Sequence, residues 1–179
     1  MSKVLVLGGG FAGLEAAIYL RKQSLEVTLV SDRDYFYIYP TSIWIPTGEA
    51  TKEDVSIPLD KLAFKHGFEL IVDPVESFDA VSKKVTLQSG RILNEYRYIV
   101  IALGQDKMQL KGMKHTLSIC GRPEEATALY EQLDQLIQKG EGKIAMGFGG
   151  NPKDTSAVRG GPAPLGYPVS APRLAAWGY

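Results

Sequence analysis

The hydrophobic pattern of the first 31 residues predicts a strand, a helix and a second strand. Residues 4–7 form a continuous apolar run, which is typical of a strand buried on both faces of a parallel sheet. Glu26–Ser31 is rich in β-branched residues and predicts the second strand. Between them, small and apolar side chains recur at helical spacing, at Gly13, Ala16, Ala17 and Leu20. Together the three elements form a βαβ unit.

The central part of the chain predicts shorter elements. A short helix is expected around residues 59–66. Four strand-like segments then follow, at residues 69–72, 75–78, 84–88 and 91–93, with a tight turn at Ser89–Gly90. We interpret these four as an antiparallel hairpin or meander inserted into an α/β scaffold. The apolar run at residues 98–102 predicts a further buried parallel strand.

The longest predicted helix begins at Pro123 and ends before Gly140. Proline suits the first helical position, and glycine suits a left-handed cap after the last one. Apolar side chains follow the helical period at Ala126, Leu129, Tyr130, Leu133, Leu136 and Ile137. A strand at residues 143–146 and a glycine-rich turn then begin a second βαβ pattern. Five of the ten prolines follow Asn151, so residues from 155 onward are expected to be irregular.

These elements predict an α/β fold of Rossmann type, with a parallel sheet and an inserted antiparallel hairpin or meander. A truncated start of a second dinucleotide-binding unit follows. The predicted boundaries are residues 1–140 for the first domain, 141–163 for the start of the second unit and 164–179 for an irregular tail. A length of 179 residues suits one compact core.

Composition excludes several classes of function. Twenty basic residues balance twenty acidic ones, so no overall field favours nucleic acid or an anionic membrane surface. The N-terminal apolar run is interrupted by three glycines and Glu15, unlike a signal peptide, and no apolar stretch is long enough for a transmembrane helix. His66 and His115 lack the spacing of a metal site. We therefore expect a cytoplasmic protein with no metal and no nucleic-acid partner.

A glycine-rich turn follows the first predicted strand. Residues 8–13 satisfy the G-x-G-x-x-G pattern between a strand and a helix. Gly8 permits a tight turn, Gly10 lets the backbone approach a diphosphate, and Gly13 lets helix and strand pack closely. The free N–H groups and the dipole at the helix start would stabilise phosphate charge.

An acidic residue stands just past the second strand, where dinucleotide-binding proteins hold a ribose. Asp32 could accept hydrogen bonds from the ribose hydroxyl pair, with Ser31 as a neighbouring candidate. Arg33 could contact a 2′-phosphate, the diphosphate or solvent. A glycine-rich turn beside a solvated aspartate is the alternative without function, and the βαβ unit alone does not distinguish NAD from FAD.

Three later segments extend the motif at residues 8–17: Val30–Phe36, Val55–Leu59 and Tyr98–Gly104. Together they resemble the FAD-binding part of flavoproteins of the pyridine nucleotide-disulfide oxidoreductase type. Among these they are most similar to sulfide:quinone oxidoreductases and type II NADH dehydrogenases. The resemblance covers residues 2–163 and implies FAD as the cofactor.

The resemblance also implies positions for FAD contacts. The turn would place Phe11 and Ala12 beside the cofactor with the three motif glycines. Ala102, Leu103 and Gly104 match the family's second flavin motif, in which Leu103 replaces a threonine. Pro40 and Thr41 match the loop near the isoalloxazine ring, and Val75 matches a backbone position at the adenine. An ordinary loop proline and an ordinary strand valine are the alternatives at Pro40 and Val75.

The resemblance implies a catalytic cysteine at Cys120, beside the flavin. The expected chemistry of such a residue is thiolate attack or persulfide formation, which requires an accessible thiol, whereas a buried cysteine would act only as a small apolar side chain. Sulfide oxidation in the family uses a cysteine pair, and Arg159 occupies the position of the second member. Pro152 replaces the third glycine of the second nucleotide-binding motif, which argues against NADH binding there.

Two main functions follow from the resemblance. The first is an FAD-dependent oxidoreductase that transfers electrons from NADH or sulfide to a quinone, present here as an N-terminal fragment and cytoplasmic or peripheral to the membrane. The second is a catalytically inactive, truncated dinucleotide-binding module. A homo-oligomer or a companion chain is compatible with both. A classical NAD-dependent dehydrogenase is disfavoured, because no substrate domain follows.

Overall fold

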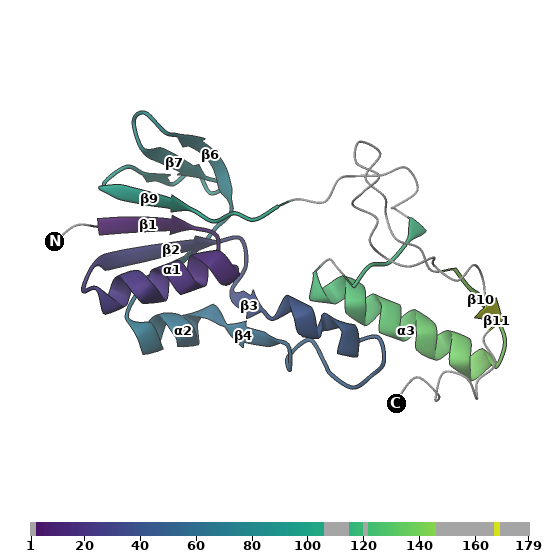
Figure 1. The fold of residues 1–179 in the computed structure, drawn as a ribbon. Helices are drawn as coiled ribbons and strands as arrows, with labels where there is room; N and C mark the ends of the chain where they lie inside the picture. Colours follow the sequence, from purple (N-terminus) through teal and green to yellow (C-terminus); the bar gives the residue numbers. More distant parts are fainter. Residues whose placement is uncertain (1–2, 106–114, 120–121, 146–166, 169–179) are drawn as a thin grey trace, which may run out of the picture. The chain divides into compact units, whose positions relative to one another are not determined.

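A computed structural model describes residues 3–105, 115–119 and 122–145 and the backbone of residues 167–168 (Figure 1). It divides into two compact units. The first consists of Met1–Thr41 and Thr51–Lys107, and the second of Ser42–Ala50 and Met108–Tyr179. The predicted site around the glycine-rich turn lies in the first unit.

A four-stranded parallel sheet forms the centre of the first unit. Its strands are β1 (Lys3–Leu7), β2 (Glu26–Ser31), β5 (Glu69–Val72) and β9 (Tyr98–Ile101), in the order β5-β2-β1-β9. Each pairing is parallel, with Val6 opposite Leu29 on one side and Val100 on the other. This arrangement confirms the predicted Rossmann-like sheet.

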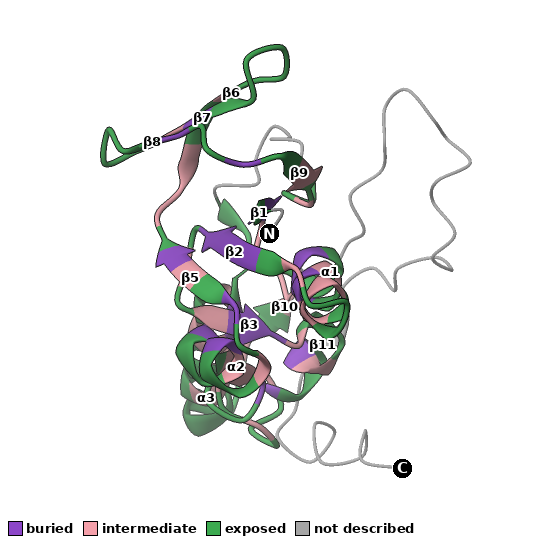
Figure 2. Cartoon of the chain, turned by 90° about the vertical axis from the view of Figure 1, so that its left-hand side faces the viewer, coloured by how far each residue is buried: buried purple, intermediate pink, exposed green. Residues whose placement is uncertain are grey.

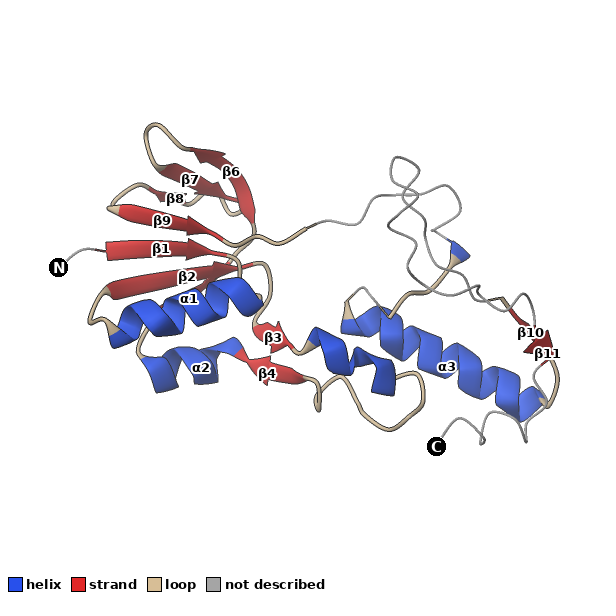
Figure 3. Cartoon of the chain, viewed as in Figure 1, coloured by secondary structure: helices blue, strands red, loops and turns tan. Residues whose placement is uncertain are grey.

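Two layers cover the sheet, one on each face (Figure 3). The helices α1 (Phe11–Lys22) and α2 (Leu59–His66) pack on one face, where Val4 and Val6 point. The second layer is the antiparallel sheet of β6 (Val75–Asp79), β7 (Lys84–Leu87) and β8 (Ile92–Leu93), over Leu5 and Leu7. Because successive side chains alternate between the two cores, β1 must be apolar at every position from Val4 to Leu7. The neighbouring strand β2 is likewise mostly buried (Figure 2).

Most predicted elements are present, with one difference in the sheet. The bounds of β2 and α2 agree with the sequence prediction, and Gly90, with φ of 85°, makes the predicted turn between β7 and β8. The segment at residues 69–72 was predicted within the antiparallel insertion, but β5 pairs parallel with β2. Helix α2 precedes it and serves as the crossover that returns the chain to the parallel sheet.

A small antiparallel ribbon, which the sequence pattern did not predict, lies on the helical side of the first unit. It pairs β3 (Tyr35–Tyr37) with β4 (Ser56–Pro58), and Phe36 joins the helical core. A 3-10 helix, Tyr39–Trp44, follows β3.

The second unit contains α3 (Pro123–Lys139) and a short ribbon of β10 (Lys143–Ile144) and β11 (Tyr167–Pro168). As predicted, proline stands in the first turn of α3, and Gly140 adopts a left-handed conformation after its last turn. The predicted strand at residues 143–146 is shorter, and it pairs antiparallel. Most of the predicted second nucleotide-binding unit and tail lies outside the described residues, so the boundaries at 140 and 163 stay predictions.

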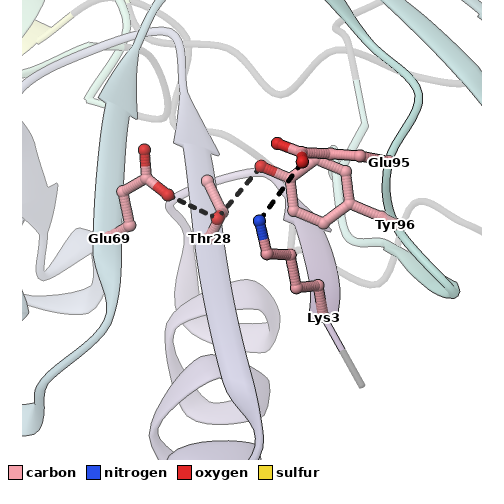
Figure 4. Close-up of polar contacts among 5 residues, drawn as sticks. All are labelled: Lys3, Thr28, Glu69, Glu95 and Tyr96. Carbon is pink, nitrogen blue, oxygen red and sulfur yellow. Dashed lines mark hydrogen bonds and ion pairs between the residues drawn. The ribbon is translucent and has the colours of Figure 1, made fainter. Parts of the chain in front are cut away.

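A polar chain joins β2 to β5 and to the segment before β9 (Figure 4). The buried Tyr96 hydroxyl donates to Thr28 Oγ1 (3.1 Å), and Thr28 Oγ1 donates to Glu69 Oε2 (2.9 Å). Nearby, Lys3 Nζ pairs with Glu95 Oε2 at 3.2 Å on the surface, where such pairs contribute little to stability. The Thr28 hydroxyl therefore accepts a hydrogen bond from the buried Tyr96 hydroxyl and donates one to the Glu69 carboxylate.

The hydrogen bonds from Tyr96 to Thr28 and from Thr28 to Glu69 predict which substitution destabilises the protein more. Tyr96→Phe should lower the free energy of unfolding by about 1 kcal/mol, because it removes one hydrogen bond. Thr28→Val should cost more, about 1–3 kcal/mol, because it leaves the buried Tyr96 hydroxyl without this acceptor. Urea denaturation of both variants and of the double variant would test this. Equal losses for the two single variants, adding fully in the double, would contradict the coupling.

Candidate dinucleotide-binding site

The predicted site segments meet at the carboxyl edge of the parallel sheet. Gly8 N donates to Val30 O (2.8 Å), and Ala102 N donates to Leu7 O (2.8 Å). Asp73 N donates to Ser31 O, also at 2.8 Å. The chain leaving β1, β5 and β9 is therefore held beside the neighbouring strand. In open α/β sheets this edge is where ligands bind.

The glycines of the turn have different surroundings. Gly8 has φ of +112°, and a Cβ there would overlap the carbonyl of Ala102. A Cβ at Gly13 would overlap the carbonyl of Gly8, which agrees with the close packing predicted for this position. A Cβ at Gly10 would meet no atom within 4 Å. The backbone at Gly10 thus faces open space, as the approach of a diphosphate requires.

One glycine in the turn has a role that the motif did not predict. A Cβ at Gly9 would overlap the Ser31 side chain, and it would also press on Leu59. The motif allows any residue at this position. Only the closeness of the end of β2, which becomes visible in the structure, explains the glycine.

Helix α1 begins at this edge without a side-chain cap. Gly10 is the N-cap residue, and the first turn carries no acidic side chain. The first two helical residues, Phe11 and Ala12, are exposed, and the Phe11 ring packs edge-on against Phe36 with ring centres 4.8 Å apart. The positive end of the helix dipole is therefore directed toward an accessible surface, where it favours an anion.

Ser31, Asp32 and Arg33 lie at the end of β2 and just after it, and each makes different contacts. Ser31 is fully buried, and its Oγ accepts a hydrogen bond from Arg33 N (3.3 Å). Asp32 Oδ1 pairs with Arg33 Nε at 3.0 Å, and the Arg33 guanidinium lies 5.9 Å from the centre of the Tyr35 ring. Sequence reasoning proposed Asp32 and Arg33 as separate contacts, whereas the structure joins them in one ion pair.

The residues implied by the family resemblance lie in three places. Ala102, half-buried, packs against Gly8, and Leu103 and Gly104 follow it as exposed residues at the end of β9. Val75 begins β6 and pairs with Leu87. In the 3-10 helix, Pro40 is exposed, and the Thr41 hydroxyl donates to Ile38 O (2.6 Å).

Cys120, the candidate catalytic residue, lies outside the described residues. The residue before it is described, and the carbonyl of Ile119 accepts a hydrogen bond from Ser42 Oγ (3.1 Å). Ser42 is buried and directly follows Thr41 in the chain. No sequence signal indicated this hydrogen bond of Ser42.

The part of the chain that the structure describes also bears on metal binding and on membrane insertion. It contains no cluster of three or more histidine, cysteine or acidic residues able to hold a metal ion. None of its helices combines the length and the hydrophobicity needed to cross a bilayer. A groove of about 390 Å³ lies at the opposite, amino edge of the sheet, lined by charges of both signs, including Lys3, Arg21 and Glu69. We place the candidate site at the carboxyl edge, because the glycine turn is there.

A parallel sheet whose first crossover combines a glycine-rich turn with an uncapped helix start defines a dinucleotide-binding fold of Rossmann type. The sequence matches the pyridine nucleotide-disulphide oxidoreductase family over residues 2–152. The chain therefore belongs to this family, which confirms the resemblance seen in the sequence.

Individual relatives agree with this family. The sulfide-quinone reductase of Aquifex aeolicus is 42% identical over 103 residues, which are 56% of this chain and 24% of the relative. A type II NADH:quinone oxidoreductase of Staphylococcus epidermidis is 29% identical over 169 residues, 89% of this chain and 40% of the relative. The chain thus spans well under half the length of either relative.

Solved structures show the same fold. The crystal structure of the sulfide:quinone oxidoreductase from Aquifex aeolicus has a TM-score of 0.70 and 35% identity, and the match covers 77% of this chain and 33% of that one. NDH2 from Plasmodium falciparum has a TM-score of 0.67 at 16% identity, with coverage of 77% and 30%. The second likeness shows the fold alone.

The glycine geometry predicts opposite effects at two positions. Gly10→Ser should keep the protein folded, because serine is a favoured N-cap and its Cβ enters open space. It should weaken binding of an adenine dinucleotide roughly tenfold or more, since its side chain would occupy the approach to the N–H groups. Gly13→Ala should instead destabilise the fold by about 1–3 kcal/mol or more.

Thermal unfolding and equilibrium binding of both variants would test this pair. A Gly10→Ser protein that binds dinucleotide as tightly as the wild type would contradict the assignment of this turn. A fully stable Gly13→Ala protein would contradict the close contact between α1 and the sheet.

Proposed function

We propose that this chain binds FAD and forms the flavin-binding part of an oxidoreductase that transfers electrons from NADH or sulfide to a quinone. The observation that carries the proposal is the open space at Gly10, next to the uncapped start of α1. A diphosphate fits that position in both shape and charge. Family membership supports FAD over other dinucleotides, and the two groups of relatives support a quinone as the acceptor.

Different residues at the carboxyl edge would bind different parts of FAD. The backbone of Gly10, Phe11 and Ala12 would bind the diphosphate, with Gly8 and Gly13 holding the turn in place. Asp32 would accept the hydroxyl groups of the adenosine ribose, beside Ser31 and Arg33. The backbone at Val75 would contact the adenine. The remaining contacts would come from Pro40, Thr41, Ala102, Leu103 and Gly104.

When bound, FAD would supply the redox centre that accepts an electron pair from the donor and passes it to the quinone. The chain's own part is to bind and orient the flavin. At the described edge, backbone amides and the Asp32 carboxylate would hold the cofactor by hydrogen bonds, without any proton transfer by these residues.

The electron donor separates two branches of the proposal. The sulfide branch would use Cys120 as a nucleophile, yet this sequence holds one cysteine, with Arg159 at the position of the second. The NADH branch does not need a thiol. In both branches we propose a cytoplasmic protein at the membrane surface, where a quinone is reached, and an oligomer or a companion chain stays a prediction.

The inactive dinucleotide-binding module remains the alternative. It shares the FAD site with the leading proposal and differs from it only in lacking turnover. Neither group of relatives gives it specific support, since both carry the names of quinone oxidoreductases.

Cofactor binding can be tested directly. Protein purified with FAD should be yellow and should keep flavin absorption through gel filtration, at close to one flavin per chain. The Gly10→Ser variant is the matched control and should lose most of its flavin under the same conditions. A wild-type sample that stays colourless after incubation with FAD would overturn the proposal.

Turnover assays distinguish the donors. Reduction of a soluble quinone analogue should follow either NADH or sulfide. If sulfide is the donor, Cys120→Ser should abolish the activity while flavin binding is kept, because only the nucleophile is removed. If NADH is the donor, the same variant should keep its activity. Flavin binding with no turnover from either donor would favour the inactive module.

A further inference from the structure

Strand β9 forms one side of the parallel sheet, and within the described residues its outer side has no strand beside it (Figure 1). It pairs with β1 alone, whereas β1 and β2 each have a strand on both sides. The side chains at its two ends, Tyr98 and Ile101, are 52% and 59% exposed. The outer side of such a strand presents a row of unpaired N–H and C=O groups, which can accept a further strand.

The sequence of β9 lacks the features that usually prevent such pairing. Residues 98–104 contain no charged side chain and no proline, and the strand itself consists of aromatic and β-branched residues. The adjoining charge is Arg97, whose guanidinium lies 5.5 Å from the centre of the Tyr98 ring. The opposite outer strand, β5, begins with a glutamate and is followed by Asp73 and Pro74. Since charges and proline block an outer strand, β9 is the side of the sheet that favours further pairing.

The alternation of the backbone determines which groups of β9 are open. Just after the strand, Ala102 N donates to Leu7 O on the β1 side. Because backbone groups alternate in direction along a strand, the N–H and C=O groups of Ile99 and Ile101 point away from β1. Two antiparallel copies of β9 can therefore exchange hydrogen bonds at these two residues, about a two-fold axis at Val100. In this register each Ile99 faces Ile101 of the second copy, which is a favourable cross-strand pair.

We propose that β9 is an interface for a second copy of this chain, whose own β9 pairs with it antiparallel and joins the two parallel sheets into one. Because both copies use the same surface, the contact closes at a dimer. The chain has no net charge, so two copies do not repel each other overall. A pairing of four-residue strands is small beside the roughly 1,200–2,000 Å² of stable interfaces, so we expect a weak dimer. The proposal does not depend on the cofactor.

Sedimentation velocity over a concentration series tests the proposal. Wild-type protein should change from monomer to dimer between about 1 and 100 μM. Ile101→Lys places a charge on the outer strand, and Ile101→Pro removes an N–H group that β1 does not use. Each should weaken dimerisation roughly tenfold or more while the protein stays folded by circular dichroism. The matched control is Val72→Lys, which adds the same charge at the last residue of β5, a valine that is 49% exposed. It should leave dimerisation unchanged.

Hydrogen–deuterium exchange gives a second readout at the strand itself. Protection of the Ile99 and Ile101 amides should increase with protein concentration. Protection that does not change with concentration would overturn the proposal, because a segment of the same chain would then cover β9. A wild-type protein that remains monomeric up to about 100 μM would also overturn it. So would oligomers larger than a dimer, or a dimer that Val72→Lys weakens as much as Ile101→Lys. None of these results would affect the proposed binding of FAD, which the absorption of the purified protein tests separately.

Discussion

Close backbone contact at the start of α1 is the constraint on which the rest of the site depends. The helix can reach the ends of the strands only because Gly13 lies directly on the carbonyl of Gly8, and Gly8 on that of Ala102. A methyl group at either position would push the helix away from the sheet. Its first N–H groups would then no longer reach the edge where β1, β2 and β9 end. The anion site is therefore a product of packing as much as of motif chemistry.

The two cores explain why this edge can remain open. One core lies between the sheet and the helices, and the other lies under the antiparallel sheet of β6, β7 and β8. Both use side chains of the strands, so exposed residues beyond the strand ends, such as Gly10 and Leu103, take no part in either core. Loops on such a scaffold are free to serve binding. Leu7, the last residue of β1, is fully buried, whereas Gly10 and Leu103, a few residues beyond the strand ends, are exposed.

Elements with a strong local pattern were predictable from the sequence, and pairings between distant segments were not. The bounds of β2 and α2 follow from β-branched and amphipathic runs, which act over a few residues. Strand β5 has only four residues, three of them apolar, and nothing in its sequence indicates whether its neighbour is β2 or β6. The ribbon of β3 and β4 joins segments about twenty residues apart through only three residue pairs. Such short pairings depend on tertiary packing more than on propensity.

The same distinction applies within the candidate site. The motif identified Gly8, Gly10 and Gly13, because each has a steric reason that recurs in many proteins. It could not show that Asp32 pairs with Arg33, because that depends on the path of the chain after β2. Ser42 is a similar case, since its hydrogen bond to Ile119 joins residues 77 positions apart.

The ion pair also affects how a negatively charged ligand can bind at all. The chain has no net charge, so attraction of a diphosphate must arise locally. Asp32 follows β2 at the same edge of the sheet, and its carboxylate adds negative charge there. Arg33 compensates that charge at 3.0 Å while leaving the carboxylate partly exposed. The edge therefore combines a partly exposed carboxylate, compensated by Arg33, with the positive end of helix α1.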